Sequence, residues 1–73
     1  MTIYAYSSHE AAIARISVEP ERSQQLMRAQ YSAACHGWVL YWLRSDGTTR
    51  MLTDTGWVDI WRSPVEPAVR LVA

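Results

Sequence analysis

Cysteine is nearly absent from this chain of 73 residues, and lysine and phenylalanine are missing altogether. Cys35 is the single cysteine, so no disulfide can form within the chain, and a lone thiol is typical of a reducing compartment. The seven basic residues are all arginine and balance seven acidic residues, which gives a formal net charge of zero. This balance argues against a binder driven mainly by phosphate charge, because such proteins carry a basic excess.

Long apolar runs are also absent. No stretch approaches the roughly 18 apolar residues that a membrane-spanning helix needs, so no membrane span is expected. The first ten residues lack the basic start and apolar core of a signal peptide, which predicts a cytoplasmic protein. The length fits one domain over residues 1–73.

Residues with the spacing of known catalytic or metal sites are missing too. Cys35 and His36 form one Cys-His pair, but no second pair completes a zinc site. There is no glycine-rich phosphate loop, no Ser-His-Asp set and no pair of catalytic acids. Asp46 and Asp54 fall in turn sequences, where aspartate serves the backbone. We therefore expect no catalytic residue, no metal and no cofactor, and interpret Cys35 as a structural thiol.

Aromatic residues are abundant, with four tryptophans and four tyrosines. Both types combine an apolar body with a polar tip and are enriched at protein interfaces. A very small core that needs large side chains would explain them equally well. Composition alone leaves these two explanations open.

The first third of the chain is predicted to form two strands. Residues 2–6 are β-branched and aromatic, which is typical of a strand. Residues 12–18 alternate small or apolar with other residues, which favours a second strand paired with the first. A helix is the alternative for this segment, because Ser7 and Glu10 have the S-x-x-E spacing of a capping box.

The middle third predicts the main helix, from Pro20 to Cys35. Proline is tolerated in a first helical turn, and the segment is rich in helix formers. His36 would favour the helix C-terminus and Gly37 would cap it. The apolar stripe at spacings of three and four comprises Leu26, Met27, Gln30, Ala33 and Ala34.

The last part predicts three antiparallel strands, at residues 38–44, 48–53 and 57–61. Turns at 45–47 and 54–56 each contain Asp and Gly, which is a strong hairpin signal. Residues 62–73 are predicted to be an extended tail, in which 68–72 could add an edge strand. The predicted fold is α+β, with one helix packed on an antiparallel sheet in the order ββαβββ and a C-terminal three-stranded meander.

The register decides which side chains face the helix. Three-residue loops would pair Trp42 with Arg50 and Thr53 with Trp57. Leu40, Trp42 and Leu52 then face the helix, because side chains alternate across a sheet. The opposite face would expose Tyr41, Met51, Trp57 and Trp61, and a two-residue second turn would swap the two tryptophans between faces. The tail, a second copy in a homodimer or a foreign partner could cover such a patch.

Three short motifs resemble a family. Ser23-Gln24, Cys35-His36-Gly37 and Trp57-Val58-Asp59, within residues 20–60, resemble a type I-F group of small phage anti-CRISPR proteins. The resemblance implies a non-enzymatic protein in the cytoplasm of a host bacterium. It would bind a Cas subunit of a type I CRISPR surveillance complex (Cascade) and block target DNA binding. The partner-binding residues under this hypothesis are Arg22, Gln25, Arg28, Tyr41, Trp57 and Trp61.

The alternative is a small nucleic-acid-binding or regulatory phage protein. Arginine beside exposed tyrosine and tryptophan is a pattern that binds single-stranded nucleic acid, through charge and base stacking. The zero net charge makes this the second choice.

Overall fold

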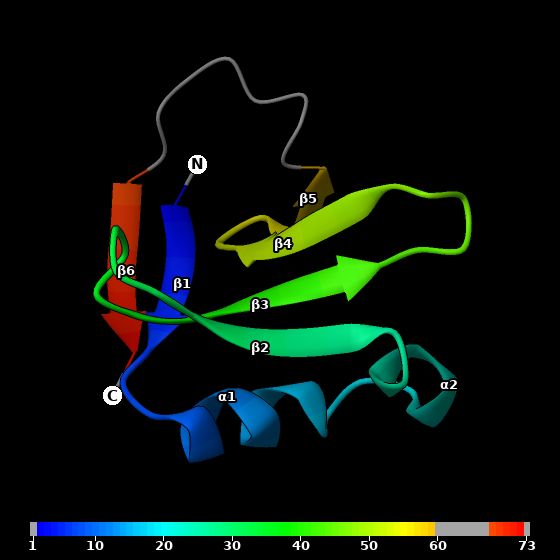
Figure 1. The fold of residues 1–73 in the computed structure, drawn as a ribbon, viewed down its shortest axis with the longest axis horizontal. Coiled ribbons are helices and arrows are strands. Elements are labelled where there is room, and N and C mark those ends of the chain that lie inside the picture. The colour runs from blue at the N-terminus through cyan, green and yellow to red at the C-terminus, as the bar shows by residue number, and fades with distance from the viewer. Residues whose placement is uncertain (1, 60–67, 73) are drawn as a thin grey trace.

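A computed structural model describes residues 2–59 and 68–72 of the chain. Two helices and six strands lie within these residues, and the strands form one sheet with the helices below it (Figure 1). The α+β class predicted from the sequence is confirmed. The elements in chain order are β1 (Thr2–Tyr6), α1 (His9–Ile16), α2 (Glu21–Gln24), β2 (Met27–Ser32), β3 (Gly37–Leu43), β4 (Thr49–Thr53), β5 (Gly56–Asp59) and β6 (Ala68–Val72).

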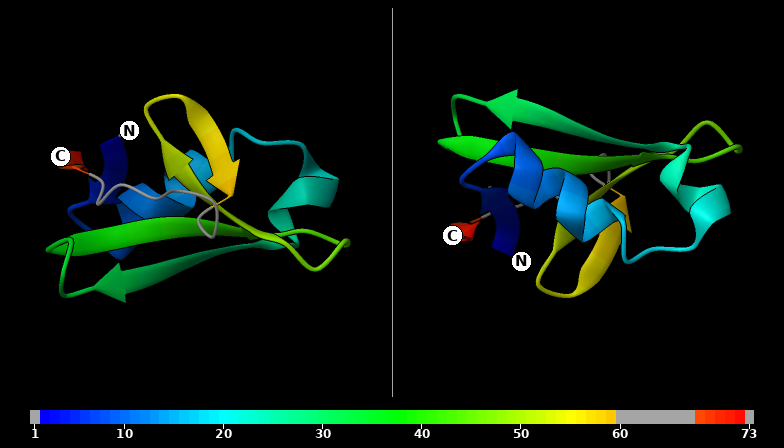
Figure 2. Two further views of the ribbon diagram at one scale, coloured as in Figure 1. Left: turned by 90° about the horizontal axis from the view of Figure 1, so that it is seen from above. Right: turned by 90° about the horizontal axis from the view of Figure 1, so that it is seen from below.

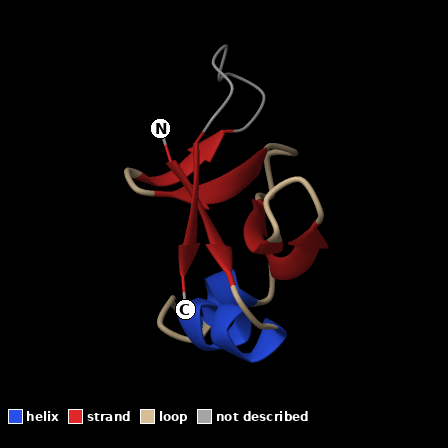
Figure 3. Cartoon of the chain, turned by 90° about the vertical axis from the view of Figure 1, so that its left-hand side faces the viewer, coloured by secondary structure: helices blue, strands red, loops and turns tan. Residues whose placement is uncertain are grey.

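Strand β1 is the centre of the sheet. One of its edges pairs antiparallel with two strands, through Tyr6 opposite Trp38 of β3 and Ile3 opposite Thr53 of β4. Its other edge pairs in parallel with β6 over all five residues. The two parallel strands run side by side toward the helices (Figure 3). Residues 68–72, which the sequence placed in an extended tail that could add an edge strand, do form a strand, and it pairs with β1.

Helix α1 covers one face of the sheet. It lies between the β2–β3 and β4–β5 hairpins when the molecule is seen from below (Figure 2). It buries Ala12 and Ile16, while Ile13 and Ala14 are exposed. The prediction of a strand at residues 12–18 was wrong, and the helical alternative holds. Small residues favour a helix here, and a side-chain cap fixes its start.

That cap is Ser8. Its hydroxyl oxygen accepts a hydrogen bond of 3.1 Å from the Ala11 amide, one of the donors that a helix start leaves without a partner. We expect Ser8→Ala to lower the free energy of unfolding by about 1 kcal/mol. Urea denaturation followed by circular dichroism measures this loss. Ser7→Ala is the matched control and should change little, because the cap is Ser8; equal losses in both variants would contradict this assignment.

The segment predicted as the main helix, Pro20 to Cys35, forms no long helix and contains strand β2. Only the short helix α2 forms in it, and residues 27–32 pair with β3 along six positions, from Met27 opposite Trp42 to Ser32 opposite Gly37. Residues 33–36 then turn the chain, with His36 at φ 57°. His36 and Gly37 therefore cap no helix. The prediction was wrong because hydrogen bonding to a long neighbouring strand outweighs the weak helix propensity of the segment.

The C-terminal meander is confirmed, and the register of its first hairpin is as predicted. Tyr41 lies opposite Met51 and Trp42 opposite Arg50. The turn before β4 is fixed by Asp46, whose carboxylate accepts bonds from the Thr48 amide at 2.9 Å and hydroxyl at 2.6 Å. These bonds from Thr48 lower the pKa of Asp46. Asp46 thus serves the backbone, as expected.

The second hairpin differs from the prediction by one residue. Thr53 pairs with Gly56 and Leu52 with Trp57, so the turn contains only Asp54 and Thr55. Gly56 adopts φ 106°, a conformation that favours glycine. The shift moves Trp57 to the other face of the sheet, so its predicted place on the outer face was wrong.

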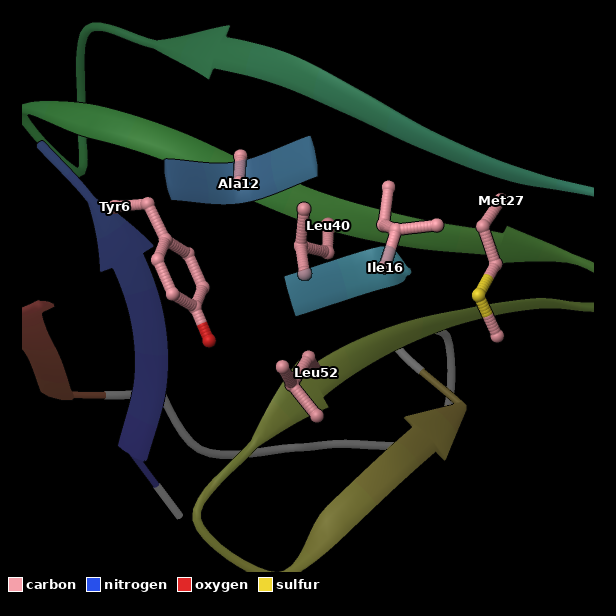
Figure 4. Close-up of a cluster of buried hydrophobic side chains, with 6 residues drawn as sticks. All are labelled: Tyr6, Ala12, Ile16, Met27, Leu40 and Leu52. Carbon is pink, nitrogen blue, oxygen red and sulfur yellow. The ribbon is translucent and has the colours of Figure 1, made fainter. Parts of the chain in front are cut away.

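The main core lies between α1 and the sheet. We call it the helix-side cluster, and Figure 4 shows its buried members around Leu40. Leu40 and Ala12 have no exposed surface, and the partly buried Trp42 and Trp57 pack against the cluster. The members are Tyr6, Ala12, Ile16, Met27, Leu40 and Leu52.

The opposite face of the sheet is also largely buried. Ile3, Ala5, Val39 and Met51 form what we call the outer cluster, with Cys35 and Tyr41 packed against it. Met51 is only 7% exposed, so the prediction of an exposed patch that includes it was wrong. Two separate clusters therefore share the small core.

Candidate functional site

The structure brings three of the predicted partner-binding residues together. The Arg28 guanidinium donates 2.8 Å to the Gln25 carbonyl oxygen, and Arg28 lies opposite Tyr41. Tyr41 itself is half-buried against the outer cluster. Burial raises the pKa of its phenol, and the nearby Cys35 raises it further. These residues meet around β2, although no long helix carries them.

The other predicted residues lie elsewhere. Arg22 is exposed on α2, whereas Trp57 lies on the helix side, where its indole NH donates 3.5 Å to Glu19. Glu19 also forms an ion pair of 2.8 Å with Arg15 of α1. Trp61 falls outside the described residues. The six residues therefore do not form one surface.

The outer edges of the sheet decide where another chain could pair with it. Strand β5 has four residues, and very short edge strands recruit other chains poorly. Strand β2 is longer, but Arg28 donates 2.7 Å to the carbonyl oxygen of Met27 on it. Its own arginine thus occupies part of the β2 edge. Exposed charged residues are a common protection of such edges.

Strand β6 offers a different edge. The Ser7 amide donates 2.9 Å to the Val72 carbonyl oxygen, so Val72 directs its backbone groups toward β1. Backbone groups alternate between the two edges of a strand, and Ala68 and Arg70 therefore do the same. Val69 and Leu71 direct their N–H and C=O groups away from β1. Within residues 2–59 and 68–72, no strand pairs with that edge.

The side chains of β6 leave this edge apolar. Val69 is 42% exposed and Leu71 is 57% exposed, and Arg70 is the one charged residue of the strand. Sequence reasoning recognised this strand but assigned no function to it. The available signal was a short segment outside the meander, residues 68–72, that is apolar apart from the charge of Arg70.

A pocket opens beside β6 on the helix side of the sheet. Its volume is about 380 Å³, and it is lined by Tyr4, Tyr6, Arg70, Leu71 and Val72. Tyr4 lies directly opposite Arg70, and Tyr6 opposite Val72. Burial raises the pKa of the Tyr6 phenol, an effect that Arg15 partly offsets, so this hydroxyl stays protonated at neutral pH. Arg70 and Tyr4 therefore line this pocket beside the buried Tyr6.

A set of arginine and tryptophan side chains lies on the same face near the meander. The Arg44 guanidinium carbon lies 4.8 Å from the Trp42 ring centroid, and the Trp42 and Trp57 rings meet edge to face at 5.8 Å. Arg50 lies opposite Trp42. We call these four residues the arginine–tryptophan cluster. The Trp42 indole nitrogen and the Arg50 Nε are buried with no hydrogen-bond partner among the described residues.

Metal-binding clusters and membrane-spanning helices are not found in the described part of the chain. Comparison with protein-family models, with curated proteins and with solved structures gave no match for this chain. The geometry of the described residues is therefore the basis for a functional proposal.

Proposed function

We propose that this chain is a non-enzymatic binding domain that docks an extended segment of another protein along the outer edge of β6. The observation that carries the proposal is the outward direction of the Val69 and Leu71 backbone groups on a strand paired only through its other edge in the described residues. Added strands bind through such groups, and alternate side chains give specificity.

The β6 edge suits a protein partner better than the other edges do. Its exposed Val69 and Leu71 supply apolar area, which an added strand would cover. The edges of β2 and β5 are guarded or short, as described above. Natural proteins usually protect an exposed apolar edge of this kind, so an edge that no strand of residues 2–59 or 68–72 covers favours a role in binding.

The resemblance to type I-F anti-CRISPR proteins supplies the partner for this proposal. The segment that docks belongs to a Cas subunit of a type I effector complex in the cytoplasm of a bacterial host, and docking prevents target DNA binding. The chain acts by occupying a surface, without catalysis or a cofactor. Val69 and Leu71 then contact the docked segment, whereas Arg28 and Tyr41, which lie around β2, would contact another part of the same subunit.

Single-stranded nucleic acid is a second candidate partner, and the arginine–tryptophan cluster favours it. Arg44 lies over the Trp42 ring and Arg50 lies opposite it, a combination of charge and aromatic faces that suits stacked bases. The formal net charge of zero ranks it second, because electrostatic attraction provides most of non-specific nucleic-acid affinity.

The first experiment compares Leu71→Pro with Leu71→Ala. Both remove the leucine side chain, but only proline removes the outward N–H. In variants that fold alike, the difference in affinity therefore reports mainly on the backbone bond. We expect Leu71→Pro to bind a purified type I effector complex about tenfold more weakly than Leu71→Ala does, the loss expected for one interfacial hydrogen bond. Biolayer interferometry measures the affinities, and a gel-shift assay measures target DNA binding.

Circular dichroism of both variants checks that they fold. Equal affinities in the two folded variants would reject strand addition at β6. Wild-type protein that binds no type I complex would reject the anti-CRISPR assignment. Affinity for single-stranded DNA that falls steeply with salt, and is lost in Trp42→Ala, would favour the nucleic-acid candidate instead.

A further inference from the structure

We infer that the pocket beside β6 selects a partner segment with an aspartate or glutamate directly opposite Arg70. The inference rests on the proposed strand addition, since it names the side chain that the added strand carries at one position. Its basis is the pocket formed by Tyr4, Tyr6, Arg70, Leu71 and Val72.

The sheet geometry fixes where that side chain points. A residue opposite Arg70 on an added strand places its side chain on the same face as Arg70, in either strand direction. Arg70 is paired with Tyr4 on its other side, and both line the pocket on that face. The partner side chain therefore lies beside the Arg70 guanidinium at the pocket, with Tyr4 on the far side of Arg70.

The groups in the pocket are complementary to a carboxylate. Arginine offers a planar fork of N–H donors that matches the two oxygens of a carboxylate. The apolar Leu71 and Val72 can pack against the methylene groups of the incoming side chain.

The same geometry disfavours a second copy of this chain as the occupant. In a two-fold antiparallel pairing with full overlap, the outward residues Val69 and Leu71 of one copy meet Leu71 and Val69 of the other. The Arg70 side chains of the two copies then lie directly opposite each other. Like charges in directly opposite positions destabilise a sheet, whereas an acidic residue there forms a favourable pair.

The test uses two small probes of nearly the same shape, N-acetylglutamate methylamide and N-acetylglutamine methylamide, in which a carboxamide replaces the carboxylate. Amide chemical shifts of the ¹⁵N-labelled chain are followed during titration with each probe. We expect the glutamate probe to shift Tyr4, Tyr6, Arg70 and Val72 with a dissociation constant of about 10 mM, and the glutamine probe to bind about tenfold more weakly.

Arg70→Gln is the matched variant, and it is exposed, so the fold should persist with a dispersed spectrum. We expect it to weaken glutamate binding about tenfold and Arg70→Lys to retain part of the affinity. Equal shifts from both probes, shifts away from the pocket, or unchanged binding in Arg70→Gln would each overturn the inference. These outcomes are independent of Leu71→Pro, so a failed strand addition and a failed carboxylate pocket are told apart.

Discussion

Replacing Leu40 with alanine is expected to lower the free energy of unfolding by about 3 kcal/mol, within the range measured for buried leucines. Leu40 has no exposed surface and lies at the centre of the helix-side cluster, in contact range of both the sheet and α1 (Figure 4). A chain of 73 residues has about 4–11 kcal/mol of total stability. The variant would therefore lose a large fraction of it.

Leu43 provides the matched control on the same strand. It is 44% exposed, so Leu43→Ala should cost less than about 0.5 kcal/mol. Urea denaturation followed by tryptophan fluorescence reports both variants. Similar losses at Leu40 and Leu43 would contradict the placement of the core between α1 and the sheet.

Gly37→Ala is expected to lower the free energy of unfolding by about 2 kcal/mol, because there is no room for a methyl group. A Cβ placed on Gly37 would lie 2.9 Å from the Tyr6 carbonyl oxygen and 3.1 Å from both the Ala5 Cβ and the Leu71 Cδ1. The oxygen belongs to the backbone of the central strand, which cannot move without disturbing its ladders. The loss should therefore appear as a lower midpoint in urea.

Gly47 separates lack of space from backbone strain. It adopts φ 87° in a turn, and no atom lies within 4 Å of a Cβ placed there. Gly47→Ala should therefore cost about 1 kcal/mol through its conformation alone. The double variant Gly37→Ala, Leu71→Ala tests the packing directly, since it removes one of the three close atoms and should recover only part of the loss. A fully stable Gly37→Ala would contradict the close approach of Gly37 to the backbone of β1.

Local signals predicted the meander and its first register. Ser45-Asp46-Gly47 specifies a turn through bonds that lie within a few residues, such as those from Thr48 to Asp46. The second turn carries a similar Asp-x-Gly sequence, yet it closes one residue earlier. Asp54 there also holds the start of β1, where its carboxylate accepts a bond of 3.0 Å from the Thr2 amide. This contact between Asp54 and the start of β1 is found together with a turn one residue shorter than the sequence predicted.

In the first half of the chain, the sequence prediction interchanged a strand and a helix. Residues 12–18 were predicted as strand but lie mostly in α1, and the segment predicted as the main helix contains β2. Met27, Ala29 and Tyr31 alternate with Arg28 and Gln30, so a strand pattern was present beneath the helix-forming composition. Choosing between them requires knowing that β3 is available along six positions. Likewise, the candidate binding edge depends on β6 pairing with β1, which lies more than 60 residues earlier in the chain.

The sequence by itself determined the α+β class and the three-stranded meander, because turn residues and alternation act over short distances. It left open whether residues 68–72 add a strand. The tertiary structure alone decided that residues 27–32 form a strand, that Trp57 faces the helix and that Arg70 meets Tyr4 at a pocket. Each depends on which distant strand a segment pairs with. Such pairing is set by the total burial and hydrogen bonding of the whole chain, which no local stretch of sequence contains.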